Sequence, residues 1–177
     1  MQNKIIFRRL KREEINKFIE IDRFEEIEEI YYHRDNQLVI EKESYKISQF
    51  DNVEEEYLAV LTDCYDSGGV LIGAFNEIGK LVGLGSVNGH PIQKMTNVLQ
   101  LERLYISSNY RHQGIGKQIL LLLQEEARKL GAKQLYVSSI PTKNSVDFYQ
   151  SVGFQLTTPL KALFELEPED IHMVLAL

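Results

Sequence analysis

The chain has 177 residues, of which 44% are hydrophobic and 26% are charged, and its formal net charge is −6. This length and composition predict one globular domain, residues 1–177, large enough to bury a core. The negative charge disfavours nucleic acid as a partner, because nucleic-acid binding normally needs a basic surface. No apolar run approaches the roughly 20 residues of a membrane-spanning helix, so no membrane partner is expected.

The chain contains a single cysteine, Cys64, which excludes an internal disulfide and suits a reducing cytoplasm. The first residues also lack an apolar signal segment followed by a small-residue cleavage site, so a cytoplasmic protein is expected. Cys64 is predicted to be a small packing residue of a helix. The spacing of His33, His90 and His172 fits no set of metal ligands, and no metal is expected.

Hydrophobic periodicity and turn residues predict strands and helices along the whole chain. The predicted elements are residues 5–7 (strand), 12–23 (helix), 52–65 (helix), 70–75 and 80–87 (hairpin), 98–106 (strand), 114–130 (helix), 135–140 (strand), 145–152 (helix), 154–156 and 173–177 (strands). In the first helix, Ile15, Phe18 and Ile19 share the apolar side, and Asn52 caps the second helix. The pattern predicts an α+β fold with a mixed sheet.

Residues 27–47 fit two structures. They form either a hairpin of two apolar segments around Asp35 and Asn36, or a helix with an insertion loop. The acidic run at residues 25–29 has two interpretations as well. It either favours a cationic amine on the acceptor side or forms the solvated face of a helix.

The helix at residues 114–130 is expected to bury one side and to end at Gly131. Its predicted buried stripe is Ile115, Ile119, Leu122, Leu123, Ala127 and Leu130. Gly83 and Gly85 share one face of the strand at residues 80–87. They either leave room for a ligand or mark a twist of that strand.

An apolar strand runs through a basic, glycine-bearing loop into this long helix, which predicts a phosphate site. The first N–H groups of a helix have no intrahelical partner, and the helix dipole favours negative charge there. A Walker A loop would need Ser or Thr where Gln118 stands, and a Rossmann loop would need glycine at Ile119. What remains is Arg-x-x-Gly-x-Gly, formed by Arg111, Gly114 and Gly116.

This motif resembles the acetyl-CoA loop of the GNAT superfamily of N-acetyltransferases. A second segment of the chain, with Asn144, Phe148, Tyr149 and then Gly153-Phe154, resembles the second half of the GNAT core. The resemblance covers residues 98–157. It implies a GNAT fold, in which a central, mixed and mostly antiparallel sheet is flanked by helices, and an acetyl-CoA-dependent enzyme.

The resemblance also implies how the co-substrate acetyl-CoA is bound. The backbone of the strand at residues 98–106 would run beside the pantetheine, and the loop would hold the pyrophosphate. The implied binding residues are Leu104, Tyr105, Ile106, Arg111, His112, Gln113, Gly114, Ile115, Gly116, Lys117 and Asn144. Asn144 would serve the pantetheine amides, cap a helix, or do both. The chain departs from the family pattern at Ser108, often proline, and at His112, often glycine; His112 either carries charge near phosphate or is merely exposed.

Acetyl transfer to an amine needs a base, because an ammonium group must lose its proton before it can attack. Alternation along the strand puts Glu102 on the same face as Leu104 and turns Arg103 the other way. By resemblance Glu102 is the general base and Tyr149 the general acid for the leaving thiolate. The alternatives are that Glu102 pairs with a cation or that solvent takes the proton, and that Tyr149 is a core aromatic. The resemblance also implies that a backbone N–H near Leu104 or Ile106, where family members have a β-bulge, would meet the oxyanion.

The predicted reaction is direct acetyl transfer in a ternary complex to a primary amine of a small molecule, such as a polyamine, an antibiotic or an amino acid. The alternatives are a protein or peptide acetyltransferase, and a non-catalytic regulatory module that binds CoA. Tyr31, Tyr32 and Tyr45 either line the acceptor pocket or pack in the core. The apolar segment at residues 173–177 would allow a homodimer.

Overall fold

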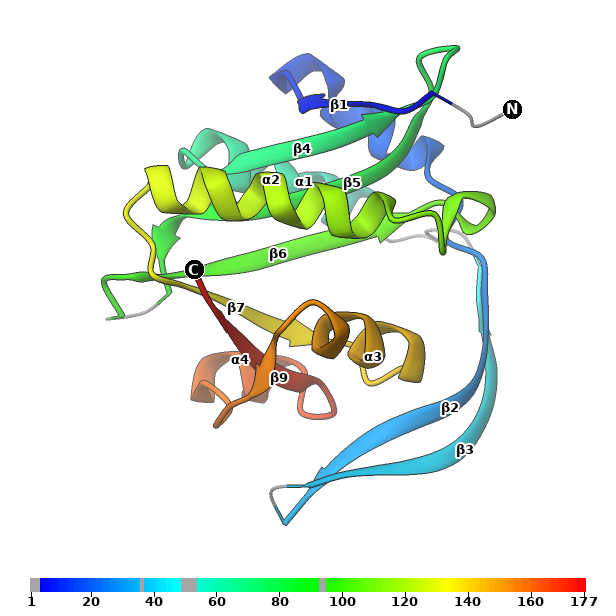
Figure 1. Ribbon diagram of the computed structural model, residues 1–177, viewed down its shortest axis with the longest axis vertical. Coiled ribbons are helices and arrows are strands. Elements are labelled where there is room, and N and C mark those ends of the chain that lie inside the picture. Colours follow the sequence, from blue (N-terminus) through cyan, green and yellow to red (C-terminus); the bar gives the residue numbers. More distant parts are fainter. Residues whose placement is uncertain (1–3, 36, 49–53, 93–94) are drawn as a thin grey trace.

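The computed structural model describes residues 4–35, 37–48, 54–92 and 95–177. Its strands are β1 (Ile6–Arg9), β2 (Glu25–Arg34), β3 (Gln37–Ile47), β4 (Val70–Phe75), β5 (Leu81–Pro91), β6 (Val98–Ile106), β7 (Gln134–Ser139), β8 (Gln155–Leu156) and β9 (Ile171–Ala176). A seven-stranded sheet in the order β1-β4-β5-β6-β7-β9-β8 forms the centre, and β2 and β3 make a separate hairpin beside it (Figure 1). The β6–β7 pair is parallel and the other pairs are antiparallel, so the predicted mixed, mostly antiparallel sheet is confirmed.

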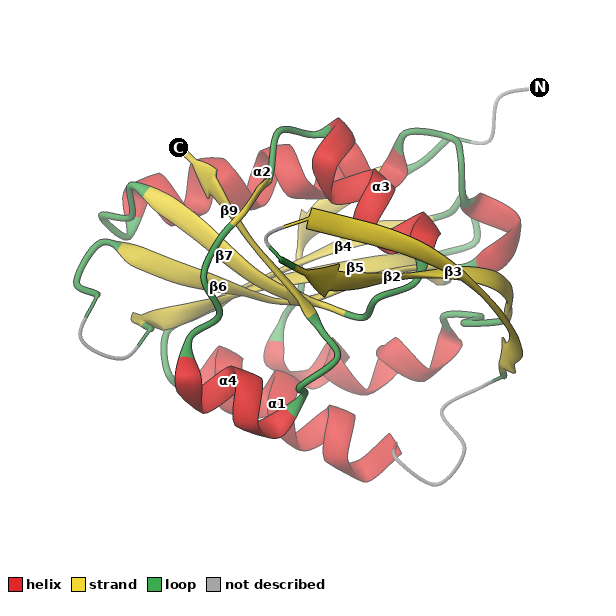
Figure 2. Ribbon diagram, turned by 90° about the horizontal axis from the view of Figure 1, so that it is seen from below, coloured by secondary structure: helices red, strands yellow, loops and turns green. Residues whose placement is uncertain are grey.

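Helices cover both faces of this sheet. They are the 3₁₀ helices η1 (Arg12–Glu20) and η2 (Ser108–Tyr110) and the α-helices α1 (Glu54–Asp66), α2 (Ile115–Lys129), α3 (Lys143–Ser151) and α4 (Lys161–Leu166). Figure 2 shows α2 and α3 on one face and α1 and α4 on the other. The middle strands therefore bury both sides, and all six residues of β4 are buried. None of the described helices is long and apolar enough to cross a membrane.

The first helix differs from the prediction in its type. It is a 3₁₀ helix, which has three residues per turn, so residues three apart lie on one side. Ile15, Phe18 and Ile21 are accordingly buried, whereas Ile19, predicted on the same side, is 56% exposed. The prediction for Ile19 was wrong because it assumed the α-helical period of 3.6.

The hairpin alternative for residues 27–47 is confirmed. Strands β2 and β3 pair from Glu25 with Ile47 to Arg34 with Gln37. Of the two predicted turn residues, Asp35 takes a positive φ of 50°, and Asn36 lies outside the described residues. The acidic run at the start of β2 is a strand, so its interpretation as a helix face was wrong.

The helix predicted at residues 52–65 is α1, although its predicted cap, Asn52, lies outside the described residues. Cys64 is buried, as predicted for a packing residue, and its thiol donates to the Val87 carbonyl oxygen at 3.4 Å. Burial raises the pKa of this thiol to about 12. A thiol so far from ionising is no nucleophile at neutral pH.

Helix α2 buries most of its predicted stripe and adds Leu120 to it. Leu130 is 44% exposed because it is the C-cap, one residue beyond the last helical turn. Gly131 follows with a φ of 87°, which confirms it as the stop. The short helix α4 was not predicted, since its six residues are too few to show a period.

Gly83 and Gly85 leave room for α2 rather than for a ligand. A methyl group at Gly85 would lie 2.5 Å from Ile119 Cγ2 and 2.8 Å from Leu123 Cδ1, both side chains of α2. At Gly83 it would lie 2.9 Å from Ile106 Cδ1. The two glycines thus set how closely α2 approaches the sheet, and the interpretation of their face as ligand space was wrong.

Gly85→Ala is therefore expected to lower the free energy of unfolding by about 1–3 kcal/mol, as overpacking of a close-packed core does. Gly116→Ala is the matched control, because its new methyl would meet Phe148 at an ordinary 3.4 Å. Alanine is also favoured in a helix by about 1 kcal/mol, so the control should keep or gain stability. Urea denaturation of the ligand-free proteins measures both, and equal losses would contradict the packing argument.

Candidate functional site

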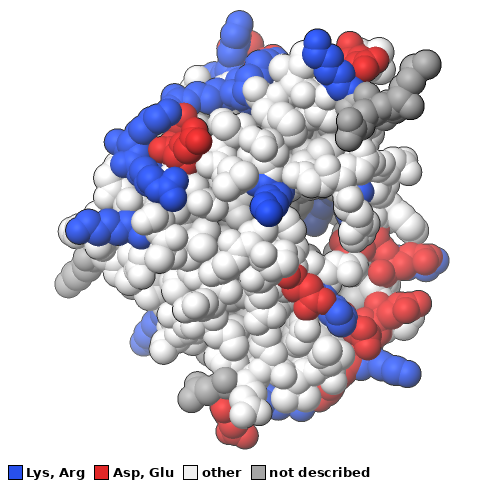
Figure 3. All heavy atoms as spheres, in the orientation of Figure 1, with Lys and Arg blue, Asp and Glu red and all other residues white. Residues whose placement is uncertain are grey.

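A wedge opens between β6 and β7. The two strands pair over residues 98–100 and 134–136 and part beyond them. Figure 1 shows them diverging toward the start of α2 and the start of α3. The space-filling view in the same orientation shows the surface hollowed between the body of the molecule and the β2–β3 hairpin, with acidic side chains on the hairpin side (Figure 3). The wedge thus brings together the two segments on which the family resemblance was based.

One edge of β6 offers backbone groups to this wedge. The Ser107 N–H donates to the Val82 carbonyl on β5 at 2.9 Å. Antiparallel residues alternate, so Tyr105 also directs its N–H and C=O toward β5, and Leu104 and Ile106 direct theirs away. In agreement, the Ile106 carbonyl accepts a 3.1 Å hydrogen bond from Arg111 Nε in the loop before α2.

The loop before α2 forms a seat for an anion. The first backbone hydrogen bond of the helix runs from the Gln118 N–H to the Gly114 carbonyl, at 3.0 Å. Among the described residues, the N–H groups of residues 115–117 have no acceptor. Gly114 takes a φ of 79°, and nothing lies within 4 Å of where its Cβ would stand. Free amides at a helix start with open space above them are what a phosphate requires.

The side chains around this seat fall into two groups. His112, Gln113 and Lys117 are exposed, and Gln113 donates to the Asn109 carbonyl at 3.0 Å, which tightens the loop. Ile115 is buried in the core and fixes the first turn of the helix in place, and Gly116 faces the ring of Phe148 on α3. The exposed cations are therefore the ones free to meet a phosphate.

Arg111 does not fit the expectation that it surrounds the anion with free positive charge. Its Nε donates to Ile106, its Nη2 donates to the Arg23 carbonyl at 3.2 Å, and its Nη1 lies 3.2 Å from the Glu25 carboxylate. The guanidinium thus joins the loop to the start of β2. Sequence reasoning did not find Glu25, because the motif carries no information about distant segments.

Asn144 is likewise engaged by Glu25. Its Nδ2 donates to Glu25 Oε1 at 2.8 Å, and it lies in the first turn of α3. Thr142 is the N-cap of that helix, so the prediction of Asn144 as a cap was wrong. Its side chain still reaches the wedge, where it is exposed.

Ser108 departs from the family pattern for a structural reason. Its N–H donates to the Asp22 carbonyl at 2.9 Å, and its hydroxyl bonds the Asp22 carboxylate. A proline at this position could not make the first of these bonds. Ser107 adds a third, because its hydroxyl accepts from the Asp22 N–H at 3.1 Å.

A β-bulge decides where Glu102 points. Ser86 pairs with Arg103 and Val87 with Leu101, which leaves Glu102 as the extra residue of β6. Alternation is broken there, and Glu102 Oε1 accepts from Arg103 Nη1 at 3.1 Å instead of facing away from it. Arg103 in turn lies over the ring of Tyr57, on the α1 face. Arg103 thus lies on the opposite side of the strand from Leu104, as predicted, whereas the predicted orientation of Glu102 was wrong. The bulge lies at Glu102, two residues before Leu104.

Both oxygens of Glu102 have partners, since Oε2 accepts from Asn88 Nδ2 at 2.8 Å. Its side chain is 15% exposed. The alternative that Glu102 pairs with a cation is therefore present in the structure. This pairing does not by itself exclude a role as base, because a side chain that is held in place is also positioned.

Tyr149 is buried in the core and packs edge-to-face against Phe148 and Phe154. Its hydroxyl has no hydrogen-bond partner in the described part of the chain. Burial raises the pKa of this phenol well above its usual value, and the charge of Arg103 opposes that rise. Tyr149 therefore keeps its proton at neutral pH. The core-aromatic alternative is therefore present in the structure, with a phenol that stays neutral.

Asp170, just before β9, is a carboxylate that sequence reasoning missed. Its Oδ2 accepts from the Ser138 hydroxyl at 2.8 Å, on the parted end of β7. Burial raises the pKa of Asp170, while the bond from Ser138 and the charge of Arg103 lower it. The Asp170 charge also acts on Tyr149, which places the two near each other. No motif signals Asp170, because it comes to the wedge only through the pairing of β7 with β9.

The three N-terminal tyrosines lie on the hairpin. Tyr31 packs against the core and donates through its hydroxyl to Asp147 of α3 at 2.8 Å. Tyr45 is 41% exposed. Burial and nearby carboxylates, Glu43 among them, raise the pKa of both Tyr32 and Tyr45. Core packing holds for Tyr31 and does not hold for Tyr45.

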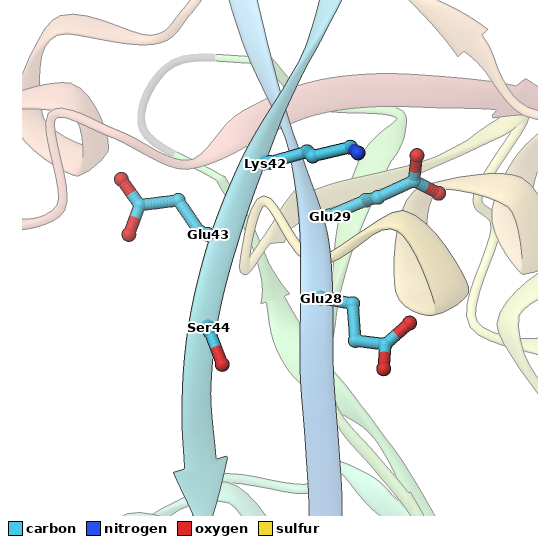
Figure 4. A pocket seen from close by; sticks show the side chains of 5 residues that line it. All are labelled: Glu28, Glu29, Lys42, Glu43 and Ser44. Atoms are coloured by element: carbon cyan, nitrogen blue, oxygen red, sulfur yellow. The ribbon is translucent and has the colours of Figure 1, made fainter.

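A shallow hollow of about 510 Å³ lies on the hairpin itself (Figure 4). It is lined by Glu28, Glu29, Lys42, Glu43 and Ser44. In the close-up, Glu29 and Lys42 point to the same side, and Glu43 points to the other. The hollow shares no residue with the wedge, so it is a feature of the acidic hairpin and not the place of the chemistry.

This fold and this wedge define a class of protein. Residues 22–154 match the Acetyltransferase (GNAT) family, and the chain belongs to it. The protein is therefore an acyltransferase of the N-acetyltransferase class. A comparison with curated protein sequences finds no match.

Solved structures give the same result for the fold. The chain is similar to nourseothricin acetyltransferase (TM-score 0.72, 16% identity, 96% of this chain and 95% of that one). It is similar to a streptothricin acetyltransferase candidate from Bacillus anthracis str. Ames in complex with acetyl coenzyme A (TM-score 0.71, 14% identity, 97% of this chain and 96% of that one). A third similar structure is that of the PaiA N-acetyltransferase from Thermoplasma acidophilum in complex with coenzyme A (TM-score 0.67, 21% identity, 98% of this chain and 99% of that one).

His112 takes a φ of 59°, the left-handed conformation that favours glycine. We expect His112→Gly to be more stable than His112→Ala by about 1 kcal/mol, because alanine keeps the Cβ that opposes this conformation. At an ordinary helix or strand position the sign is reversed, and glycine is worse by about 0.5–1 kcal/mol. Urea unfolding of both ligand-free variants measures the difference. An alanine variant that is the more stable would show that position 112 is not strained.

Proposed function

We propose that the protein transfers the acetyl group of acetyl-CoA directly to a primary amine of a small molecule, in a ternary complex. The observation that carries this proposal is the wedge between β6 and β7, which opens onto the free amides at the start of α2. The neighbours crystallised with acetyl coenzyme A and coenzyme A, which share the fold, support it.

The residues present fit this co-substrate. The amides of residues 115–117, with Lys117 and His112 beside them, would hold the pyrophosphate. The outward N–H and C=O groups of Leu104 and Ile106 would pair with the amides of the pantetheine, as a neighbouring strand would. Asn144 would add a side-chain amide on the other side of the wedge.

Acetyl-CoA would supply a thioester, whose C–S bond breaks as the amine nitrogen bonds to the acetyl carbon. Glu102, held by Asn88 and Arg103, takes a proton from the amine. Tyr149 gives its phenolic proton to the leaving sulfur and regains one from solvent. Asp170 binds the ammonium form of the acceptor through Oδ1, the oxygen that Ser138 leaves free. An outward N–H of β6 would stabilise the oxyanion.

The acceptor would be a cationic amine, such as a polyamine or a basic antibiotic. The acidic hairpin beside the wedge and the carboxylates of Glu102 and Asp170 favour a cation. Two structural neighbours are named as acetyltransferases of nourseothricin and streptothricin, which makes a basic antibiotic a candidate acceptor, although they share only the fold with this chain. A protein amine remains the second candidate. A non-catalytic CoA-binding module would have no need of a proton donor at Tyr149.

We expect acetyl-CoA and CoA, but not ATP or NAD, to raise the melting temperature of the purified protein. At a concentration about 100 times Kd, a ligand of the folded state adds about 2.7 kcal/mol, roughly 5–10 °C for a chain of this size. Thiol release with acetyl-CoA and a panel of spermidine, streptothricin, amino acids and a lysine peptide then identifies the acceptor. No shift with acetyl-CoA would contradict the cofactor assignment, and sole activity on the peptide would replace the small-molecule acceptor.

The roles of the three polar residues can be separated by kinetics on the best amine of that panel. Glu102→Gln and Tyr149→Phe should each lower kcat by roughly 10²–10⁴, the usual contribution of general acid–base catalysis. Asp170→Asn should instead raise KM for the amine with less change in kcat. All three should keep the Kd of acetyl-CoA within about twofold, which is the control. If Asp170→Asn lowers kcat while Glu102→Gln turns over normally, the general base is Asp170 and not Glu102.

A further inference from the structure

Residues 22–25, called the strap below, cross the loop before α2. Asp22 is bonded to Ser107 and Ser108 by three hydrogen bonds, two of them through the backbone of Asp22. Arg111 Nη2 donates to the Arg23 carbonyl at 3.2 Å. The strap is therefore fastened to the same loop whose amides form the seat for an anion.

Glu25, the last residue of the strap and the first of β2, spans the open end of the wedge. Its Oε1 accepts from Asn144 of α3 at 2.8 Å, and its Oε2 lies 3.2 Å from Arg111 Nη1. Its side chain is 15% exposed, which is low for a surface carboxylate. One negatively charged group thus occupies two of the residues that the family motif assigns to the cofactor.

We infer that Glu25 competes with acetyl-CoA for Arg111 and Asn144, lowers the affinity for the coenzyme, and is displaced when the coenzyme binds. The inference rests on the proposed function. Glu25 takes one N–H of the Asn144 amide and faces Nη1 of Arg111, whose Nε and Nη2 are held by backbone carbonyls, so the carboxylate occupies the sides of Asn144 and Arg111 that the coenzyme would contact. A carboxylate beside the pyrophosphate would also repel it.

The displacement has a consequence for the hairpin. Farther along β2, Tyr31 stays bonded to the other side of the wedge, through its N–H to the Pro141 carbonyl and through its hydroxyl to Asp147. Release of Glu25 therefore frees the first residue of β2 from Arg111 and Asn144, while Tyr31, in the middle of the strand, stays bonded to α3. Arrival of the coenzyme would loosen residues 23–30, between the remaining bonds of Asp22 and of Tyr31, beside the place proposed for the acceptor.

Isothermal titration of acetyl-CoA into the full-length protein tests the competition. Glu25→Gln keeps the size of the side chain and removes its charge, and Kd should fall roughly three- to tenfold. Glu26→Gln is the matched control, since Glu26 is the next residue, carries the same charge and pairs with Lys46 on β3. It should bind within about twofold of wild type. An equal or higher Kd for Glu25→Gln would overturn the inference and make Glu25 a support of Arg111.

Hydrogen–deuterium exchange on the wild-type protein gives an independent result if Glu25→Gln does not fold. Saturating acetyl-CoA should speed exchange in residues 23–30, whereas most ligands slow exchange near their site. Unchanged or slower exchange there overturns the displacement. No binding of acetyl-CoA by any variant removes the proposed function, whereas binding with one Kd for wild type and Glu25→Gln removes only this inference.

Discussion

Beyond Gln100 and Tyr136, strands β6 and β7 stop pairing, and a sheet of seven strands loses one ladder at its centre. Backbone groups left there need partners, because an unpaired buried donor or acceptor costs about 1–3 kcal/mol. Arg111 donates to the Ile106 carbonyl, and beyond the paired residues the two strands diverge toward the starts of α2 and α3 (Figure 1). A ligand with its own amides can take the place of the missing strand. The site therefore follows from an interruption of the sheet.

The loop before α2 carries the conformational strain of this arrangement. Two positive φ values, at His112 and Gly114 on either side of Gln113, turn the chain into the first turn of the helix. The buried Ile115 and the close approach of α2 to Gly85 keep that turn fixed against the sheet. Because the core holds the helix, the amides are in place before any anion arrives, and little ordering is left for the ligand to bring about.

Charge is arranged around the wedge in pairs rather than as free ions. Glu102 is held by Arg103 and Asn88, Asp170 by Ser138, and Glu25 by Arg111 and Asn144. Further acids lie farther out, on the β2–β3 hairpin, where Glu26 pairs with Lys46 and Glu41 with Arg34 (Figure 3). The inner groups are thus oriented by fixed donors, whereas the outer ones act through their field, which solvent screens over about 8–10 Å.

The sequence by itself determined the hairpin at residues 70–87, strand β6 and the loop with its helix, because periodicity and glycines act over a few residues; it left residues 27–47 open and missed α4. It did not determine the direction of Glu102, since a bulge depends on the pairing of β6 with β5. Nor did it find Glu25 or Asp170, which reach the wedge through contacts far apart in the chain. Such contacts are set by the packing of whole elements, so only the tertiary structure decided which carboxylates surround the site.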